Sequence, residues 1–339
     1  MPGPLLNVLN GHQVDVPPVW FMRQAGRYLP EYRALRADRG GFLDLVYDTD
    51  AAAEVTVQPI ERYGFDGAIL FSDILIVPYA LGQKLEFLAG EGPRLSPPLV
   101  DAALDELERV PQRLSPIYDT VAKVRARLAD DVTLLGFAGS PWTVATYMVA
   151  GEGSRDQHAA RAMAYRDPAA FGEIVDAIAD MTIDYLSGQI VAGAEAVQLF
   201  DSWAGSLSPA QFARWVIEPN ARIVAALAER HADTPVIGFP KGAGTKLPDY
   251  VAGTGVKAVG LDETVDPDWA HRALPPEIVV QGNLDPLHLL AGGSALDDAV
   301  DTILAAFRHR PHVFNLGHGI DRTTPLDHVS QVLNRVRSA

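Results

Sequence analysis

Short apolar runs, many of them rich in β-branched residues, recur along the chain, and each one ends in polar or turn-forming residues. Runs this short, bounded by turn signals, are typical of strands that are buried on both faces of a sheet. The pattern therefore predicts eight strands, over Val19–Met22, Asp66–Phe71, Val132–Phe137, Ala196–Phe200, Pro235–Phe239, Val256–Leu261, Ile278–Gln281 and His312–Leu316.

Between most of these runs, apolar residues recur at the spacing of an amphipathic helix. Such patterns predict helices around Ile117–Leu128, Phe171–Tyr185 and Val300–Phe307, and a last helix that begins near Thr324. Pro219 is expected to kink the helix that contains it, because proline removes a backbone donor and its ring clashes with the preceding turn.

Strand–helix alternation repeated this often predicts a parallel sheet with helical crossovers. Eight strands in a chain of 339 residues fit the α/β class as a single (β/α)8 TIM barrel, one domain over residues 1–339. An open doubly wound sheet is the alternative, because the fifth and sixth runs are joined by a short connection with a weak helix. Gly90–Pro98 is expected to be a surface loop, and Gly292–Gly293 a turn between helices.

Composition narrows the class of protein. The formal net charge is −15, which argues against nucleic acid as a partner. The chain contains no cysteine, so disulfides, thiolate metal sites and cysteine nucleophiles are excluded. No apolar run has the length of a membrane helix, and residues 1–10 lack the features of a secretory signal. We therefore expect a cytoplasmic enzyme with no membrane partner.

One basic segment contrasts with this acidic background. Residues 21–40 contain five arginines against Glu31 and Asp38, a local excess of +3. Guanidinium groups bind carboxylate or phosphate through a fixed fork of donors. Gly26 and Pro30 disfavour a regular helix through the start of the segment. The segment is therefore either an anion-binding loop after the first strand or a helix with a solvated basic face.

In a barrel, the residues that follow the strands meet at the C-terminal strand ends, where the active-site cleft is expected. Those that carry useful chemistry are Arg23, Arg27, Asp73, Ser202, Lys241, Asp262 and His318.

Each of these candidates also has an ordinary structural interpretation. Asp73 lies among apolar residues, where a carboxylate needs a partner, and it either caps the next helix or faces ligand N–H donors or a cation. His318 lies between two glycines and is either accessible to a ligand or a core histidine. Tyr147 fits a core position, Ser202 could cap a helix, and Trp203 could simply pack.

Other common motifs are weak or absent. The segment 241–246, Lys-Gly-Ala-Gly-Thr-Lys, suits phosphate but lacks the spacing of a P-loop. No glycine-rich dinucleotide fingerprint follows an early strand. None of the nine histidines forms the paired pattern of a helical zinc site.

Six motifs occur in order along the chain. Residues 18–33 read Pro-Val-Trp-Phe-Met-Arg-Gln-Ala-Gly-Arg-Tyr-Leu-Pro-Glu-Tyr-Arg, and a second long motif covers residues 136–148. Together with four shorter motifs, the sequence resembles the uroporphyrinogen decarboxylase family over nearly its whole length. The shorter motifs are residues 71–75, 200–205, 281–286 and 315–320. The sequence departs from the family pattern at Ala150, where Glu is common, and at Glu263, where Trp is common.

This resemblance implies a TIM barrel that forms a homodimer. It also implies that four acetate side chains of uroporphyrinogen III, a tetrapyrrole with eight carboxylates, become methyl groups with release of four CO2, without metal or organic cofactor. By resemblance, Asp73, Arg23 and Tyr147 are the catalytic candidates. The implied substrate-binding residues are Arg23, Arg27, Arg36, Asp73, Tyr147, Ser202 and His318.

The implied chemistry assigns opposite charges to two residues. An ionised Asp73 would accept the pyrrole N–H bonds and stabilise a cationic ring, and nearby arginines are expected to keep its pKa low. Arg23 is a candidate to deliver the proton or to hold the group that does. The alternatives are a zinc- or corrinoid-type methyltransferase of the same barrel superfamily, disfavoured by the lack of cysteine, and a tetrapyrrole-binding protein without activity.

Overall fold

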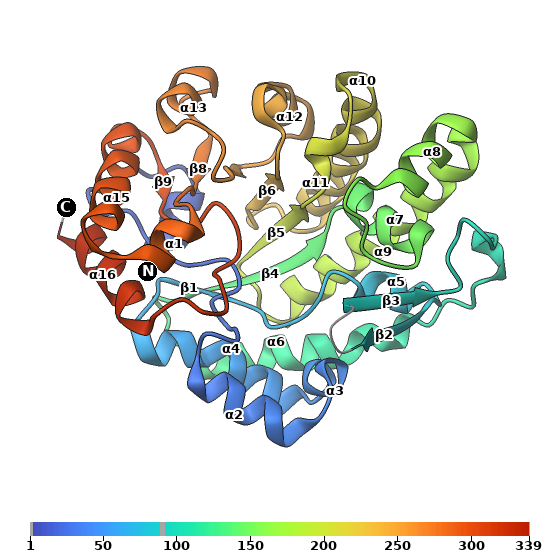
Figure 1. Cartoon of the computed structure of the whole chain (residues 1–339), viewed down its shortest axis with the longest axis horizontal. Helices are drawn as coiled ribbons and strands as arrows, with labels where there is room; N and C mark the ends of the chain where they lie inside the picture. Colours follow the sequence, from blue (N-terminus) through green and yellow to red (C-terminus); the bar gives the residue numbers. More distant parts are fainter. Residues whose placement is uncertain (1–2, 89–91, 339) are drawn as a thin grey trace.

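The computed structural model describes residues 3–88 and 92–338. Its centre is a curved, wholly parallel sheet in which each strand lies beside the next one along the chain (Figure 1). A doubly wound sheet would reverse this order at a switch point, so that alternative is wrong. The strands are β1 (Gly67–Ile69), β4 (Thr133–Gly139), β5 (Ala196–Asp201), β6 (Val236–Pro240), β7 (Ala258–Gly260), β8 (Val279–Gln281) and β9 (His312–Val313).

Helices surround the sheet and carry the chain from one strand to the next (Figure 1). They are α1 (Pro4–Leu9), α2 (Pro30–Arg39), α3 (Phe42–Tyr47), α4 (Thr49–Tyr63), α5 (Ile76–Ala80), α6 (Ser115–Arg127), α7 (Pro141–Ala150), α8 (His158–Arg166), α9 (Pro168–Ala192), α10 (Pro209–Phe212), α11 (Glu218–Arg230), α12 (Leu247–Thr254), α13 (Pro267–Ala273), α14 (Pro286–Ala291), α15 (Gly293–Phe307) and α16 (Leu326–Arg337). Shorter helical turns are η1 (Leu104–Glu106), η2 (Pro111–Leu114), η3 (Ala204–Ser206), η4 (Ala213–Ile217) and η5 (Gly244–Lys246).

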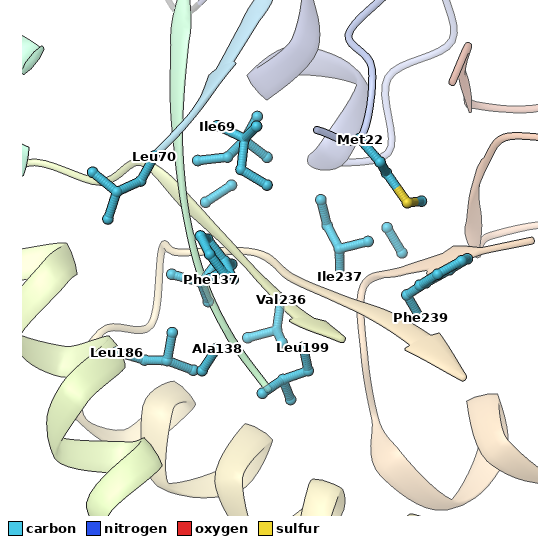
Figure 2. Packing of buried hydrophobic residues seen from close by; sticks show 14 of the residues in the cluster. Met22, Ile69, Leu70, Phe137, Ala138, Leu186, Leu199, Val236, Ile237 and Phe239 are labelled. Atoms are coloured by element: carbon cyan, nitrogen blue, oxygen red, sulfur yellow. The ribbon is translucent and has the colours of Figure 1, made fainter. Parts of the chain in front are cut away.

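The sheet is buried along its whole length, which explains its continuous apolar runs. Every residue of β4 and β6 is buried. Figure 2 shows side chains of several strands, among them Phe137, Ile237 and Phe239, packed in one cluster together with Met22. Burial of this apolar surface is the main force that holds the strands together. Seven of the eight predicted strands are thereby confirmed, with small differences at their ends.

The first predicted strand, Val19–Met22, is only partly correct. Val19 forms an isolated parallel bridge with Phe314, next to β9, and is not part of a regular strand. The same residue also contacts the start of β1, because the Asp66 backbone N–H donates to Val19 O at 3.0 Å and the Val19 N–H donates to Asp66 Oδ2 at 2.8 Å. This segment therefore bonds to both edges of the sheet without extending its ladder.

The structure tests two short segments for which the sequence predicted a loop or a turn. The expected surface loop Gly90–Pro98 is mostly wrong: β2 (Lys84–Leu88) and β3 (Gly92–Ser96) form an antiparallel hairpin, although residues 89–91 lie outside the described part of the chain. The Leu95 N–H donates to Gly151 O at 2.7 Å, so the hairpin packs on the end of α7. The turn at Gly292–Gly293 is confirmed between α14 and α15.

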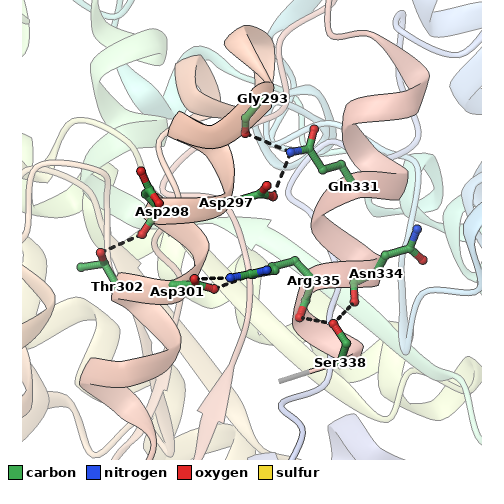
Figure 3. Close-up of polar contacts among 9 residues, drawn as sticks. All are labelled: Gly293, Asp297, Asp298, Asp301, Thr302, Gln331, Asn334, Arg335 and Ser338. Atoms are coloured by element: carbon green, nitrogen blue, oxygen red, sulfur yellow. Dashed lines mark hydrogen bonds and ion pairs between the residues drawn. The ribbon is translucent and has the colours of Figure 1, made fainter.

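The helix around Pro219 is irregular, as predicted. The chain is helical without a break from α10 through the π-helical turn η4 into α11, and Pro219 lies two residues after the π-helical turn. Prolines and π-helical turns are common causes of helix irregularity. The last helix, α16, begins at Leu326, close to the predicted start. It is joined to α15 by polar contacts that include the ion pair of Arg335 with Asp301 (Figure 3).

Within residues 3–88 and 92–338, no helix is both long enough and apolar enough to cross a membrane.

Candidate active site

The backbone on both sides of Arg23 is held by side-chain amides. The Met22 N–H donates to Asn315 Oδ1 at 3.0 Å, and Met22 O accepts from the Ile320 N–H at 3.0 Å. Gln24 is fully buried; its Nε2 donates to Gly67 O at 2.8 Å and its Oε1 accepts from the Phe21 N–H at 3.0 Å. Arg23 is therefore attached to both the end of β9 and the start of β1.

Arg23 itself has a left-handed backbone, with φ of 61°. A non-glycine residue in this region costs on the order of 1–3 kcal/mol unless its surroundings enforce it, and such residues cluster at functional sites. Its side chain lies against the Cα of Gly319, where a Cβ would come within 2.8 Å of Arg23 Cγ and 2.9 Å of Nε. The bare backbone of Gly319 thus provides the space that the arginine occupies.

Asp73 lies in the loop that follows β1, four residues beyond the strand. Its Oδ1 accepts a hydrogen bond from the Leu75 N–H at 2.8 Å, in a turn just before α5. This contact is close to the helix-capping role that the sequence left open. The preceding Ser72 hydroxyl lies 3.1 Å from the hydroxyl of the buried Tyr185. These contacts hold the loop, while the second carboxylate oxygen has no hydrogen bond among the described residues.

Nearby arginines are expected to push the pKa of Asp73 down, and Arg23 does act in this direction, but the net shift is upward. Burial raises its pKa to about 6, while the hydrogen bond from Leu75 and the charge of Arg23 oppose the shift without cancelling it. Desolvation wins because the carboxylate lies among apolar residues, and Arg23 is the one cation that acts on it noticeably. The carboxyl is therefore poised to change charge just below neutral pH.

Tyr147 is carried by α7, as the sequence indicated, and faces the same group. Burial raises the pKa of its phenol, a hydrogen bond from the Trp203 side chain opposes this, and the charge of Asp73 adds to it. Arg23 acts on the phenol in the opposite sense. Tyr147, Asp73 and Arg23 are thus within electrostatic reach of one another.

His318 joins this cluster from the loop after β9. Burial, followed by the positive charges of Lys241 and Arg23, lowers the pKa of its imidazole to about 4, against a weaker effect of Asp262. The side chain is partly exposed, so the structure does not place it in the core. It presents a neutral imidazole next to Arg23 at any ordinary pH.

Ser202 lies directly after β5 and is partly exposed. It caps no helix, because the turn η3 starts after Trp203 and has no side-chain cap. Its position depends on Asp201 and Thr143: Thr143 Oγ1 donates to the buried Asp201 Oδ1 at 2.5 Å and accepts from the Trp203 N–H at 3.1 Å. Burial raises the pKa of Asp201 to about 7.

Lys241 and Asp262 take part in the packing of loops around this cluster. Lys241 Nζ forms an ion pair with Glu263 at 3.2 Å. The buried Asp262 accepts from the Gly242 N–H at 2.7 Å and the Thr264 N–H at 2.9 Å. The glycine-rich segment 241–246 is no phosphate loop either, because Lys246 Nζ donates to Leu207 O at 2.9 Å.

Arg27 and Arg36 are separated from the other predicted residues. They line a cavity with Arg33 and Arg322, and neither Asp73, Tyr147, Ser202 nor His318 lines it. The structure thus divides the predicted set into a central cluster around Arg23 and Asp73 and an arginine-lined cavity beside α2.

The sequence did not indicate which residues hold the site side chains in position. Gln24, Asn315 and Thr143 hold Arg23 and Trp203 in place, and they lie within the motifs that carry the family resemblance. Arg322 lies outside those motifs, and its isolated charge gave no signal. No group of three or more His, Cys, Asp or Glu side chains in the described ranges is arranged to hold a metal ion.

The chain is similar to known proteins over almost its full length. The sequence profile of the family Uroporphyrinogen decarboxylase (URO-D) matches residues 3–339. The chain is 68% identical over 337 residues to a protein of Novosphingobium aromaticivorans named uroporphyrinogen decarboxylase, with 99% of each chain covered. It is 69% identical over 336 residues to a protein of the same name from Sphingopyxis alaskensis, covering 99% of this chain and 98% of the relative.

Solved structures share the fold at much lower identity. A methyltransferase from Methanosarcina mazei superposes with a TM-score of 0.79 at 18% identity, covering 99% of this chain and 97% of the other. A B12-independent methionine synthase from Shewanella sp. W3-18-1 superposes with a TM-score of 0.59 at 10% identity, covering 96% of each. Identities this low indicate a common fold and carry no argument about activity.

Proposed function

This chain belongs to the uroporphyrinogen decarboxylase family, and from that premise we propose that it converts uroporphyrinogen III to coproporphyrinogen III in tetrapyrrole biosynthesis. Each of the four acetate side chains loses CO2 and takes up one proton to become a methyl group. The observation that carries the proposal is the pairing of Asp73 and Arg23 in one cluster, in a chain with full-length relatives of this name. No metal or organic cofactor is required.

The substrate itself serves as the electron sink. Protonation of a pyrrole carbon next to the acetate-bearing carbon creates a cationic, imine-like ring. The electrons of the breaking C–CO2 bond then flow into that ring and form an exocyclic double bond, which neutralises the cation. Protonation of the exocyclic carbon and loss of the first proton from the ring restore the pyrrole and leave a methyl group.

Asp73 stabilises the cation in this scheme. Its carboxylate accepts hydrogen bonds from pyrrole N–H groups, and the attraction grows as the ring becomes positive. With a pKa of about 6, Asp73 is mostly ionised at pH 7, and the approach of N–H donors stabilises the ionised form further. Tyr147 and His318 contribute neutral polar groups to the same site, and Ser202 adds a hydroxyl.

Arg23 binds a substrate carboxylate and delivers the proton, or holds the group that does. Guanidinium groups are poor acids in general, so its left-handed backbone and enforced position are the features that support a special role. Single-turnover decarboxylation by Arg23→Lys is the test. Near-normal turnover together with near-normal binding would refute any special role of the guanidinium.

The family resemblance also supports a proposal for the architecture and assembly. In this proposal the segment around Val19 takes the place of the eighth barrel strand. Residues 1–339 then form a single (β/α)8 domain with its cleft at the C-terminal strand ends. Arg27 and Arg36 bind substrate carboxylates at the edge of this cleft. The protein works in the cytoplasm as a homodimer, which light scattering coupled to size-exclusion chromatography would detect as twice the 36.5 kDa chain mass.

An anaerobic assay tests the activity directly. Purified protein treated with a chelator should convert uroporphyrinogen III through the seven-, six- and five-carboxylate intermediates to the four-carboxylate product, with release of CO2. Asp73→Asn, a near-isosteric change, is the matched inactive control. Failure of the chelated protein, with rescue by zinc and a methyl donor, would favour a methyltransferase, an alternative that the similar full-length relatives do not favour.

A further inference from the structure

Four arginines surround one cavity of about 540 Å³ on the outer side of the central cluster. Three of them belong to the basic segment, and the fourth comes from the loop before α16, close to the other end of the chain. The residues that line the cavity are Arg27, Tyr32, Arg33, Arg36, Ala37, Gly40, Arg322 and Thr323. Its volume is in the range of small-molecule sites.

These arginines have no carboxylate partner at ion-pair distance among the described residues, although the protein is strongly acidic. Among the described residues, the recorded ion pairs include none with Arg27, Arg33, Arg36 or Arg322, while other arginines such as Arg62, Arg125 and Arg335 have carboxylate partners. Two acidic groups lie nearby, and the charge of Asp321 acts on Arg322 and Arg27 through space without a direct ion pair. The Asp321 carboxylate accepts from the Thr323 N–H and hydroxyl, and Glu31 forms a two-pronged contact with Arg62.

Two of the guanidinium groups are held in place by neutral partners. Arg33 donates to the backbone oxygens of Arg27 at 2.8 Å and Tyr28 at 3.1 Å. Arg36 donates to the Tyr32 hydroxyl at 3.3 Å and lies over the ring of Phe42, 5.7 Å from its centre. Such contacts orient a cation without cancelling its charge, which is the arrangement that an anion-binding site needs.

Two residues that line the cavity lie next to loops that carry the central cluster. Tyr32, which lines it, packs edge-on against Phe71 at 5.8 Å between ring centres, two residues before Asp73. Arg322 lies three residues beyond Gly319, against which Arg23 packs. A polycarboxylate that reaches Asp73 with its centre could therefore extend its outer arms toward this cavity.

We propose that Arg33, Arg36 and Arg322 form an outer carboxylate-binding pocket, which holds substrate carboxylates that are not being removed. This inference rests on the proposed function for the identity of the ligand. The substrate and all its intermediates keep at least four carboxylate arms, so the pocket is used at each of the four steps. Arg322 is the residue that determines its strength, because its side chain makes no hydrogen bond within the described chain.

The test compares Arg322→Gln with Arg335→Gln, which removes the arginine of the Asp301 ion pair between α15 and α16, a residue that does not line the cavity. At constant ionic strength, Arg322→Gln should raise the KM for uroporphyrinogen about threefold to tenfold, with the loss in KM rather than in kcat. Arg322→Lys should recover part of the loss, and Arg335→Gln should match the wild type.

A binding measurement tests the proposed pocket independently of the decarboxylase activity. Benzenehexacarboxylate, an unreactive polycarboxylate, should bind the wild-type protein in calorimetry, and Arg322→Gln should weaken its Kd at least threefold. Weaker binding in a protein without decarboxylase activity would uphold the pocket and reject the function. Unchanged Kd and KM in a folded, active Arg322→Gln would overturn the pocket alone. Inorganic phosphate that competes as strongly as the hexacarboxylate at equal concentration would also overturn it.

Discussion

Arg23 and Gly319 are in direct contact, and the side chain of one occupies the space where the other would carry a Cβ. The contact joins the loop after the first apolar run to the loop after β9, although the two residues are almost a full chain length apart. Because the nearest atoms belong to a flexible arginine, added bulk at position 319 moves the guanidinium before it disturbs the backbone.

Gly319→Ala should therefore reduce activity much more than stability. Displacement of a guanidinium by about 1 Å is expected to lower kcat at least tenfold, because catalytic geometry tolerates little error. The midpoint of urea unfolding should change little. Gly172→Ala is the matched control, since a Cβ there would meet only Trp215 Cη2 at 4.0 Å. A Gly319→Ala protein with wild-type kcat would show that the contact has no catalytic importance.

Asp73→Asn should lower kcat about a hundredfold or more while it raises stability at neutral pH. The folded-state pKa of about 6 lies above the ordinary value of 3.8, so the fold favours the protonated acid. That stabilisation is present below pH 4 and is lost as the pH rises through 6. At pH 7 the ionised carboxylate then costs about 3 kcal/mol, a cost that asparagine does not have.

Urea unfolding of both proteins between pH 4.5 and pH 8 measures this difference. The asparagine variant should be the more stable protein at pH 7, and the gap should close toward pH 4.5. Other titrating groups, such as Asp201, act equally in both proteins and cancel. A gap that stays constant across this range would contradict the raised pKa of Asp73.

The acidic limb of the pH–rate profile should belong to Asp73 and not to His318. The pKa of His318 is lowered to about 4 by burial and by nearby positive charges, so the imidazole is neutral throughout the assay range. In His318→Gln, kcat/KM, which reports the free enzyme, should still fall as the pH drops below about 6. Loss of this limb in the variant would assign the titration to the histidine instead.

Thr143→Val should weaken both the fold and the site. It removes the hydroxyl that donates to the buried Asp201 carboxyl and accepts from the Trp203 N–H. An unsatisfied buried polar group costs about 1–3 kcal/mol, so the urea midpoint should fall clearly. Activity should fall as well, because Trp203 bonds to Tyr147. Thr143→Ser keeps the hydroxyl and should restore most of both properties; if it is as impaired as Thr143→Val, loss of the hydroxyl contacts does not explain the defect.

The sequence by itself determined which elements form and in what order. Strand β4 and helix α9 were both predictable, because a buried run and an amphipathic repeat are local patterns along the chain. The motifs around Arg23, Asp73 and His318 likewise indicate the family, and the full-length relatives agree with that assignment.

Tertiary structure alone decided how these elements and charges combine. It reduced the first predicted strand to the Val19–Phe314 bridge, it raised the pKa of Asp73 despite Arg23, and it brought Arg322 to the arginines of α2. Strand pairing, desolvation and Coulomb interactions depend on distances through space between residues far apart in sequence. Local patterns contain no information on those distances, so the charge state of the central carboxylate and the outer arginine pocket emerge only from the folded chain.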